Sequence, residues 1–361
     1  MSDRPPPRAA VAAVLAARRA LHGLADRIVP AHIALFDKSI GLGRTSILGA
    51  LAELGIADEL ARGPATAEDL AARLDLDADA LHRVLRAAAV EGATRLDRRG
   101  RFRLTRLGRP LTTGDPRTIH AWVRYIALPS TGAAWGDLAE SVRTGRSAFR
   151  RQHGSSVWEW FSAHPDEERL FAAAMRRLTQ EDAPAIARGY PWPERGTVCD
   201  VAGGVGTLLA AILETRPGLR GVLVDAPGVL HEADAHLRQR GLRERVDLAE
   251  GDIFERVDAR ADVYVLKDVL HDWDDAASAR ILATVRATMA RGARLVVIEA
   301  LQERNRPDQI ASLADVQMLT QCEEGRQRSA QELGALLRGA GLTPGPVRRT
   351  AGPAVVEATA A

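Results

Sequence analysis

The sequence is short of cysteine, lysine and aromatic residues, and it carries almost no net charge. Its two cysteines, Cys199 and Cys322, exclude a disulfide framework and favour a reducing compartment, the cytoplasm. Cys199 falls in an expected buried strand, so we interpret it as an inert core thiol. The formal charge of +2 comes from 49 basic and 47 acidic residues spread along the chain. Nothing in it favours nucleic acid or an anionic membrane as a partner.

A long apolar run is absent as well. The alanine-rich stretch 9–17 is followed at once by Arg18 and Arg19, and its periodicity continues as an amphipathic helix to Ile28. We therefore expect neither an export signal nor a membrane span.

The first third of the chain repeats alanine and leucine at helical spacing, over 11–40 and again over 47–54, and one face of each helix is expected to be buried. Thr66 and Asp77 then precede two short helices, which end near Arg73 and Glu91. The stretch 94–104 alternates like a small hairpin. Together these patterns predict a winged helix.

A winged helix has two interpretations. It would bind DNA if His82, Arg83 and Arg86 faced a groove. It would otherwise be a structural or dimerisation module, which the mixed surface left by Leu81 and Val84 on the same helix favours.

After Pro193, strand and helix patterns alternate, which predicts a doubly wound α/β domain that binds its ligands at the carboxyl ends of parallel strands. The expected strands are 197–201, 221–225, 246–250, 263–266 and 295–299, and the expected helices are 208–213, 229–239 and 276–290. A closing hairpin is expected from 347–350 and 354–357.

The most informative stretch, 198–209, is a strand that runs into a glycine turn and opens a helix. Gly203, Gly204 and Gly206 allow close backbone approach to a ligand. A dinucleotide fingerprint would have a further glycine where this chain has Leu209. Asp225, at the end of the next strand, suits the vicinal hydroxyls of a ribose. A ribose without a pyrophosphate suggests S-adenosylmethionine.

Chemistry is expected just past the strand 263–266. Lys267 is one of only two lysines in the chain. His271 follows in a loop, where a neutral imidazole with an ordinary pKa near 6.5 could accept a proton from a phenolic hydroxyl. Asp272 or Glu299 could orient the ring, although Glu299 at the end of its strand could also be solvated.

Large side chains gather in the helical stretch 117–187. Each one alone is more easily explained as a core residue, but as a group they could wall a flat, apolar acceptor. The candidates are Trp122, Trp135, Trp158, Phe161, Phe171 and Met175.

With these motifs in this order, nearly the whole chain resembles the small-molecule O-methyltransferases of the plant caffeate and bacterial antibiotic-pathway type. Asp200-Val-Ala-Gly-Gly-Val-Gly206 resembles the cofactor-binding glycine motif of that family. Val224-Asp-Ala-Pro-Gly-Val229 resembles the ribose-binding segment of the family, and Gly251-Asp-Ile-Phe254 resembles its adenine-side loop. Leu266-Lys-Asp-Val-Leu-His-Asp-Trp273 resembles its catalytic segment.

The resemblance implies a Rossmann-like methyltransferase domain with a closing antiparallel hairpin, and a mainly helical, winged-helix dimerisation domain before it. The implied division is 1–115 for dimerisation and 116–361 for catalysis. The catalytic part would comprise substrate-lining helices, 116–190, and a Rossmann-like cofactor-binding domain, 191–361. The implied assembly is a homodimer formed through the N-terminal domain.

The resemblance also implies the site residues. His271 would be the general base, with Asp272, Glu299 and Gln327 around it. Asp272, Met318 and Cys322 would line the acceptor pocket together with the side chains of the substrate-lining helices. No metal is implied. The cofactor would be held by Asp200, Gly203, Gly204, Gly206, Asp225, Ala226, Asp252, Ile253, Phe254 and Lys267.

Two positions depart from the family pattern. Ala202 stands where the family often has another glycine, and a methyl group should be tolerable there. Gln327 stands where the family has a second glutamate that orients the histidine. An amide can accept a hydrogen bond but cannot stabilise an imidazolium by charge, so Glu299 or Asp272 should carry more of that role.

We therefore predict an SN2 transfer of methyl from S-adenosylmethionine to a phenolic or enolic oxygen of an aromatic small molecule, in secondary metabolism, with S-adenosylhomocysteine as product. One alternative is C- or N-methylation of an electron-rich ring. Another is a non-methylating enzyme on the same fold, for decarboxylation, hydroxylation or rearrangement. A third is a winged-helix regulator that senses a small ligand.

Overall fold

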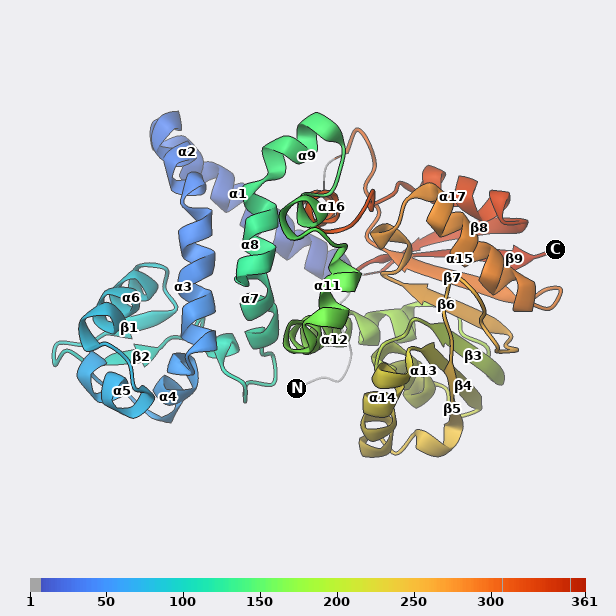
Figure 1. Cartoon of the computed structure of the whole chain (residues 1–361), viewed down its shortest axis with the longest axis horizontal. Coiled ribbons are helices and arrows are strands. Elements are labelled where there is room, and N and C mark those ends of the chain that lie inside the picture. The colour runs from blue at the N-terminus through green and yellow to red at the C-terminus, as the bar shows by residue number, and fades with distance from the viewer. Residues whose placement is uncertain (1–7, 307, 351) are drawn as a thin grey trace. The chain divides into compact units, whose positions relative to one another are not determined.

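The computed structural model describes residues 8–306, 308–350 and 352–361. Helices and a seven-stranded sheet form two compact units (Figure 1). One unit consists of Val14–Gly132 and Phe161–Arg177. The other consists of Ala133–Trp160, Leu178–Ala361 and the described start of the chain up to Ala13, and we call it the sheet unit.

The large sheet has the strand order β5-β4-β3-β6-β7-β9-β8. The first five strands in this order, β5 to β7, run parallel to one another. β9 pairs antiparallel with both β7 and β8. The predicted doubly wound sheet and its closing hairpin are thus confirmed. The strands are β3 Gly196–Val201, β4 Leu219–Asp225, β5 Val246–Glu250, β6 Val263–Lys267, β7 Arg294–Glu299, β8 Leu342–Arg349 and β9 Ala354–Ala360.

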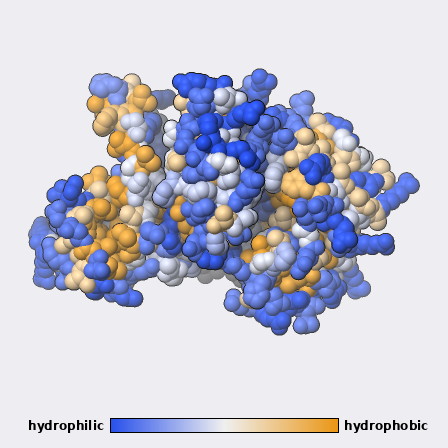
Figure 2. Space-filling view, viewed as in Figure 1, coloured by the Kyte–Doolittle hydropathy of each residue, from blue (hydrophilic) through white to orange (hydrophobic). Residues whose placement is uncertain are grey.

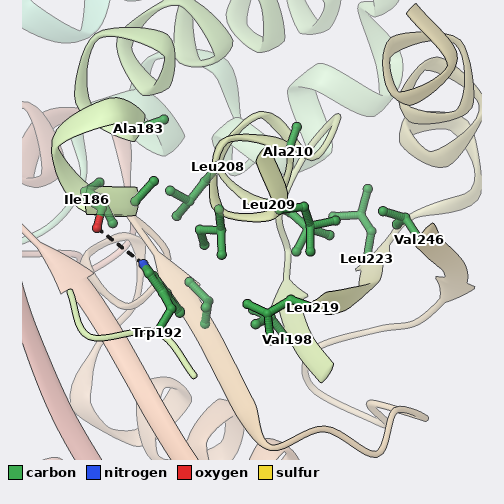
Figure 3. Packing of buried hydrophobic residues seen from close by; sticks show 14 of the residues in the cluster. Ala183, Ile186, Trp192, Val198, Leu208, Leu209, Ala210, Leu219, Leu223 and Val246 are labelled. Atoms are coloured by element: carbon green, nitrogen blue, oxygen red, sulfur yellow. Dashed lines mark hydrogen bonds between the residues drawn. The ribbon is translucent and has the colours of Figure 1, made fainter. Parts of the chain in front are cut away.

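Helices cover both faces of this sheet, because alternate residues of each buried strand point to opposite sides. Val198 contributes to a core with the helices α12, α13 and α14, while Cys199 contributes to a second core with α15 and α17. Figure 3 shows the first core, where Trp192 packs beside Ile186 and donates a hydrogen bond from Nε1 to its carbonyl oxygen at 3.4 Å.

The helices and 3-10 turns of the sheet unit are α9 Leu138–Thr144, α10 Ala148–His153, α13 Thr207–Thr215, α14 Pro227–Gln239, η2 Arg243–Arg245, η3 Leu270–Asp272, α15 Asp275–Thr288, α16 Gln309–Gln321 and α17 Ala330–Gly339. Four of the described helices contain the points where the chain passes from one unit to the other: α1 Arg8–Ile28, α8 Pro129–Gly136, α11 Val157–Ala163 and α12 Pro165–Gly189.

The N-terminal part has the predicted winged-helix outline. Thr66 forms a capping box with Asp69 at the start of α5, and Asp77 caps α6 through its side chain. Leu51, Leu70 and Phe102 lie in one core beneath these elements. The elements are α1 Arg8–Ile28, α2 Ala31–Ser39, α3 Gly41–Glu53, α4 Ile56–Arg62, α5 Ala67–Leu74, α6 Ala78–Val90, β1 Thr94–Leu96, β2 Phe102–Leu104, η1 Arg109–Leu111 and α7 His120–Ile126.

The expectation that each N-terminal helix buries one face is wrong for α2, which has no buried residue. Apolar side chains lie exposed along α1, α2 and the start of α3. Figure 2 shows an orange region at the upper left, over α2 and the start of α3. The physical reason is that, among the described residues, the core beneath α3 to α7 contains no side chain of α1 or α2. The exposed side chains include Val14, Leu21, Leu24, Ile28, Ile33, Leu35, Phe36, Ile40 and Leu42.

Among the described residues, no single helix has both the length and the apolar composition to cross a membrane. The pair Ala31–Glu53 and Ile56–Arg62, bent by 62°, meets those two criteria only when the helices are taken together.

Candidate active site

Neighbouring side chains and left-handed backbone angles require glycine in the turn after β3. A Cβ at Gly203 would lie 2.5 Å from Cγ of Asp200 and 2.6 Å from Cδ1 of Leu223, so only glycine fits there. Gly204 has a φ of 59°, and the space where its side chain would lie is open. Gly206 has a φ of 77° and caps α13. The turn therefore leaves room for a ligand beside Gly204.

Asp225 ends β4 and faces this turn. Its Oδ2 accepts a hydrogen bond from the backbone N–H of Gly204, and its Oδ1 accepts one from the N–H of Ala226, both at 2.8 Å. Burial raises the pKa of Asp225, while these two backbone donors oppose the rise. A carboxylate held in this way presents its remaining lone pairs to hydroxyl donors.

Asp200 lies inside β3 and is 2% exposed. Its Oδ2 has no hydrogen-bond partner in the described part of the chain. Burial, together with the charge of Asp225, raises the pKa of Asp200 to about 7. An unpartnered carboxyl oxygen in a buried position is costly unless a ligand supplies a donor.

Lys267 ends β6 and is largely buried, with 7% of its side chain exposed. Its Nζ pairs with Asp268 and donates to Oγ1 of Thr179 at 3.3 Å. Burial lowers the pKa of Lys267, but the charges of Asp268, Asp182 and Glu299 outweigh this and raise it. The lysine is therefore a fixed positive charge at the strand edge.

His271 lies in η3, and 16% of its side chain is exposed. Oε2 of Glu299 lies 2.8 Å from Nδ1, an ion-pair distance, although it makes no well-directed hydrogen bond. The amide nitrogen of Gln327 lies 3.2 Å from the same ring nitrogen. Nε2 lies 3.4 Å from Oδ1 of Asp272. The structure brings the four predicted catalytic side chains together.

Glu299 also shapes the turn that carries His271. It is 5% exposed and therefore not a solvated strand end. Its second oxygen, Oε1, accepts a hydrogen bond from the N–H of Leu270 at 3.0 Å. One carboxylate thus contacts both the ring and the backbone beside it.

The electrostatics of His271 differ from the sequence-based expectation of an ordinary pKa. Burial lowers the pKa of the imidazole, but the carboxylates of Glu299 and Asp272 outweigh it and raise this pKa to about 10. Burial likewise raises the pKa of Asp272 to about 6, against the opposing charge of His271. The two carboxylates therefore favour the protonated form of the ring.

Met318 and Cys322, which are predicted to line the acceptor pocket, lie next to this group. Sγ of Cys322 donates toward Oδ1 of Asp272 at 3.6 Å and lies 3.8 Å from Sδ of Met318. Burial raises the pKa of the Cys322 thiol, so it is unreactive.

An aromatic cluster lies on the predicted adenine side. Phe254 meets Trp273 edge to face at 4.7 Å between ring centroids, and Trp158 stacks on Trp273 at 5.9 Å. Asp252 is exposed and accepts a hydrogen bond from the N–H of Phe254, and Ile253 packs against the core.

The remaining aromatic candidates are divided between the two units. Trp135 belongs to the sheet unit, and its buried Nε1 has no hydrogen-bond partner among the described residues. Trp122, Phe161, Phe171 and Met175 belong to the other unit. There Phe161 stacks on Phe171 at 4.9 Å. Their role in binding an acceptor stays a prediction.

Sequence reasoning missed three residues. Arg328 donates hydrogen bonds to the carbonyl oxygens of Leu270 and Trp273, on either side of His271. Asp182 lies near Lys267, and burial raises its pKa to about 6. Gln321 is 2% exposed, and neither end of its amide has a partner among the described residues. None was detectable in advance, because each depends on contacts between distant segments.

Asp268, His271 and Glu299 also lie close enough to share a metal ion, with one ligand atom from each within 4.8 Å of the others. The ion pairs of Glu299 with His271 and of Asp268 with Lys267 account for these positions without a metal. The predicted absence of a metal stays a prediction.

The fold and this geometry define an α/β domain with an open glycine turn and a buried acid–base group at the carboxyl ends of its strands. Comparisons with known proteins identify the family. Residues 135–343 match the model of an O-methyltransferase domain, and residues 40–114 match that of an O-methyltransferase dimerisation domain. The chain belongs to this O-methyltransferase family and is a methyltransferase of the kind that uses S-adenosylmethionine.

Relatives with known names agree with this family assignment. The O-demethylpuromycin-O-methyltransferase of Streptomyces alboniger is 38% identical over 85% of this chain and 83% of that protein. The crystal structure of LaPhzM has a TM-score of 0.88 and 33% identity, over 92% of this chain and 100% of that one. NcsB1 from neocarzinostatin biosynthesis, solved with S-adenosylhomocysteine and 1,4-dihydroxy-2-naphthoic acid, has a TM-score of 0.78 and 31% identity, over 88% and 96%.

Two relatives carry other activities in their names. An 8-amino-8-demethylriboflavin N,N-dimethyltransferase of Streptomyces davaonensis is 35% identical over 85% of this chain and 89% of that protein. The aclacinomycin 10-hydroxylase RdmB of Streptomyces purpurascens is 36% identical over 81% and 79%. Family membership therefore leaves the acceptor atom to be argued from the site.

Proposed function

We propose that this protein transfers a methyl group to a phenolic or enolic oxygen of an aromatic small molecule, with His271 as general base. The contact of Glu299 with Nδ1, at 2.8 Å, supports the proposal, because it fixes the ring and leaves Nε2 to accept a proton. The position of His271 beside Asp272, Met318 and Cys322 supports an acceptor bound on that side.

We further propose S-adenosylmethionine as the cofactor and no metal. The residues suit it: Asp225 offers carboxylate oxygens to ribose hydroxyls, and the space beside Gly204 is open. Asp200 and Lys267 offer both charges that the methionyl end requires. Asp252, Ile253 and Phe254 would lie along the adenine, with Ala226 beside the ribose. When bound, this cofactor supplies an electrophilic methyl group on a sulfonium.

Before it can act as a base, His271 must lose its own proton to solvent, because an imidazolium cannot accept another. A positively charged cofactor would oppose a second positive charge and so lower the pKa of the ring toward the working range. Glu299 then stabilises the imidazolium that forms as the acceptor loses its proton. Gln327 contributes orientation without charge.

A division at 115/116, a cytoplasmic location and a homodimer formed through the N-terminal part complete the proposal. The dimerisation-domain match supports the last of these, as do the exposed apolar side chains of α1 to α3.

His271→Ala tests the base directly. With methyl-labelled S-adenosylmethionine and phenols such as 1,4-dihydroxy-2-naphthoic acid and 3-amino-4-hydroxybenzoate, we expect roughly 10²-fold to 10⁴-fold slower label transfer. Affinity for S-adenosylhomocysteine, measured by calorimetry, should stay nearly constant. His231→Ala, an exposed histidine of α14, is the control. An unchanged rate in the His271 variant would remove the general-base role.

The same assay distinguishes methyl transfer from a second candidate function, hydroxylation without methyl transfer, which the hydroxylase relative favours. A hydroxylase would convert an aromatic substrate without placing label on it. An N-methyltransferase would label an amine-bearing probe at nitrogen, which NMR of the product distinguishes from oxygen.

A further inference from the structure

Arg328 is a buried arginine next to the catalytic turn, and 3% of its side chain is exposed. Nη1 donates to the carbonyl oxygen of Leu270 at 2.6 Å, and Nη2 donates to that of Trp273 at 2.8 Å. Nε donates to Oδ1 of Asp275 at 3.0 Å. The guanidinium therefore bridges the two residues that flank His271 and Asp272.

The turn itself is weakly held by its own backbone. Its internal hydrogen bonds, from Asp272 to Val269 and from Trp273 to Leu270, are both 3.3 Å long. A 3-10 turn of this length has poor hydrogen-bond geometry and needs outside support. Ser278 gives some, since its hydroxyl lies 3.3 Å from the carbonyl oxygen of Leu270 and 3.4 Å from that of Trp273.

The segment that carries Arg328 lies directly on the turn. A Cβ at Gly325 would lie 2.7 Å from the carbonyl oxygen of His271 and 2.9 Å from that of Asp272, so glycine permits this close approach. Gln327 contacts Nδ1 of the ring. The carbonyl oxygen of Arg328 accepts a hydrogen bond from the N–H of Gln302, beyond the end of β7.

We propose that Arg328 is a positioning residue that fixes the His271 turn, and with it the distance between Nδ1 and Glu299. This inference rests on the proposed role of His271 as base. A guanidinium can reach two carbonyl oxygens at once because its donors form a rigid planar fork, whereas a lysine ammonium is a single point charge. Arg328 touches no reacting atom and acts only through the ring that it holds.

Loss of the fork changes the partners of the ring. Nδ1 lies 2.8 Å from Glu299 and Nε2 lies 3.4 Å from Asp272, so a modest rotation of the turn weakens the first contact. The Glu299 carboxylate then raises the pKa of His271 less. The ring would titrate at lower pH and would hold its accepting nitrogen less firmly.

The test compares Arg328→Lys and Arg328→Ala with Arg245→Lys and Arg245→Ala. Arg245, in η2, is a matched control because it also donates to backbone carbonyl oxygens, those of Leu213, Arg216 and Leu219. Readouts are thermal unfolding, calorimetry with S-adenosylhomocysteine, single-turnover label transfer to a phenolic probe, and titration of ¹³C-labelled histidine rings, assigned by difference from His271→Ala.

Both pairs should lower the melting temperature. Arg328→Lys, which keeps the positive charge, should lower the pKa of His271 by at least one unit. Both Arg328 variants, unlike the Arg245 variants, should slow label transfer more than tenfold, with affinity for S-adenosylhomocysteine within twofold. Added guanidinium should partly restore Arg328→Ala. If Arg328→Ala does not fold, Ser278→Ala weakens contacts to the same two carbonyl oxygens and should shift the His271 pKa in the same direction.

A folded Arg328→Lys protein with an unchanged His271 titration overturns the proposal, as does an equal shift in Arg245→Lys. The ring titration keeps this test separate from the proposed function. If His271→Ala retains full activity, the base role fails while the titration still decides whether Arg328 positions the ring.

Discussion

Ala202 has a φ of 55°, in the left-handed region that favours glycine. The sequence predicts that a methyl group is tolerable at this position, and the N–H of Ala202 donates a 2.8 Å hydrogen bond to the carbonyl oxygen of Val224. It is nevertheless held in a conformation that costs an ordinary residue roughly 1–2 kcal/mol.

Ala202→Gly should therefore raise the free energy of unfolding by about 0.5–1 kcal/mol, since relief of the strain exceeds the added flexibility of the unfolded chain. Denaturant unfolding measures this. Ala279→Gly, at an exposed position inside α15, should instead lower it by about 1 kcal/mol. A loss of stability in the Ala202 variant would contradict the account.

His271 should make stability and activity depend on pH in opposite directions. Its folded-state pKa is raised, to about 10, above the ordinary 6.5. The stabilising contribution is therefore complete below pH 6.5 and is lost as the pH rises through about 10. The accepting, neutral form gains population over the same window.

Glu299→Gln should narrow the pH range over which the stability contribution of His271 is lost, because it removes the charge that most raises the pKa of His271. We expect the ring to titrate closer to its ordinary value, and unfolding free energies measured from neutral to alkaline pH to fall less steeply. The rising limb of kcat/KM should move to lower pH. If the ring titration is unchanged, Glu299 does not control the charge of His271.

At the scale of elements, the site is made by parallel strands whose carboxyl ends meet at one edge of the sheet. β3, β4, β6 and β7 end at or near Asp200, Asp225, Lys267 and Glu299. The order of the strands, and not the order of the sequence, makes these residues neighbours.

Asp225→Ala should weaken binding of S-adenosylhomocysteine roughly tenfold to a hundredfold, since hydrogen bonds to a charged group contribute about 1.5–3 kcal/mol. Calorimetry measures the change. Asp247→Ala is the control, because Asp247 is an exposed carboxylate on the adjacent strand β5. Equal affinity in the Asp225 variant would show that this carboxylate does not hold the ribose.

Much of this architecture could be predicted, because buried strands and amphipathic helices leave periodic patterns. Thr66 and Asp77 marked their helices correctly, and the strand ends located Asp225 and Lys267. The packing around His271 could not be predicted. Its partners Glu299 and Gln327 come from two later segments, and their distances depend on tertiary contacts that leave no local pattern.

Arg328 illustrates the same limit in one residue. It is one of many arginines in the chain, and most arginines lie at the surface. Only the folded turn shows that its guanidinium is buried against two carbonyl oxygens.

For the whole molecule, the uncovered face of α1 to α3 is the feature with the clearest consequence. Phe36 is 66% exposed and Leu42 is 73% exposed, in a run of apolar side chains. A contiguous apolar surface of this kind is usually covered by another protein surface. Because a dimerisation-domain model matches residues 40–114, a second copy of the chain is the proposed partner.

Phe36→Glu combined with Leu42→Glu should convert the proposed homodimer into a 38.9 kDa monomer, because burying two carboxylates in an apolar interface is unfavourable. Light scattering after size-exclusion chromatography measures the mass. Val142→Glu, at an exposed apolar position of α9, should leave the mass unchanged. A dimer that persists in the double variant would place the interface elsewhere.

The scarcity of lysine has a practical consequence. Lys267 is 7% exposed and paired with Asp268, whereas Lys38 on α2 is 58% exposed. Guanidinium groups do not react with amine-directed reagents at neutral pH, because they remain protonated. Apart from the chain's own amino terminus, acylating dyes and amine-coupled supports should therefore attach at Lys38 alone. A fluorophore placed there would report on α2, while the ammonium group at the end of β6 would stay unmodified.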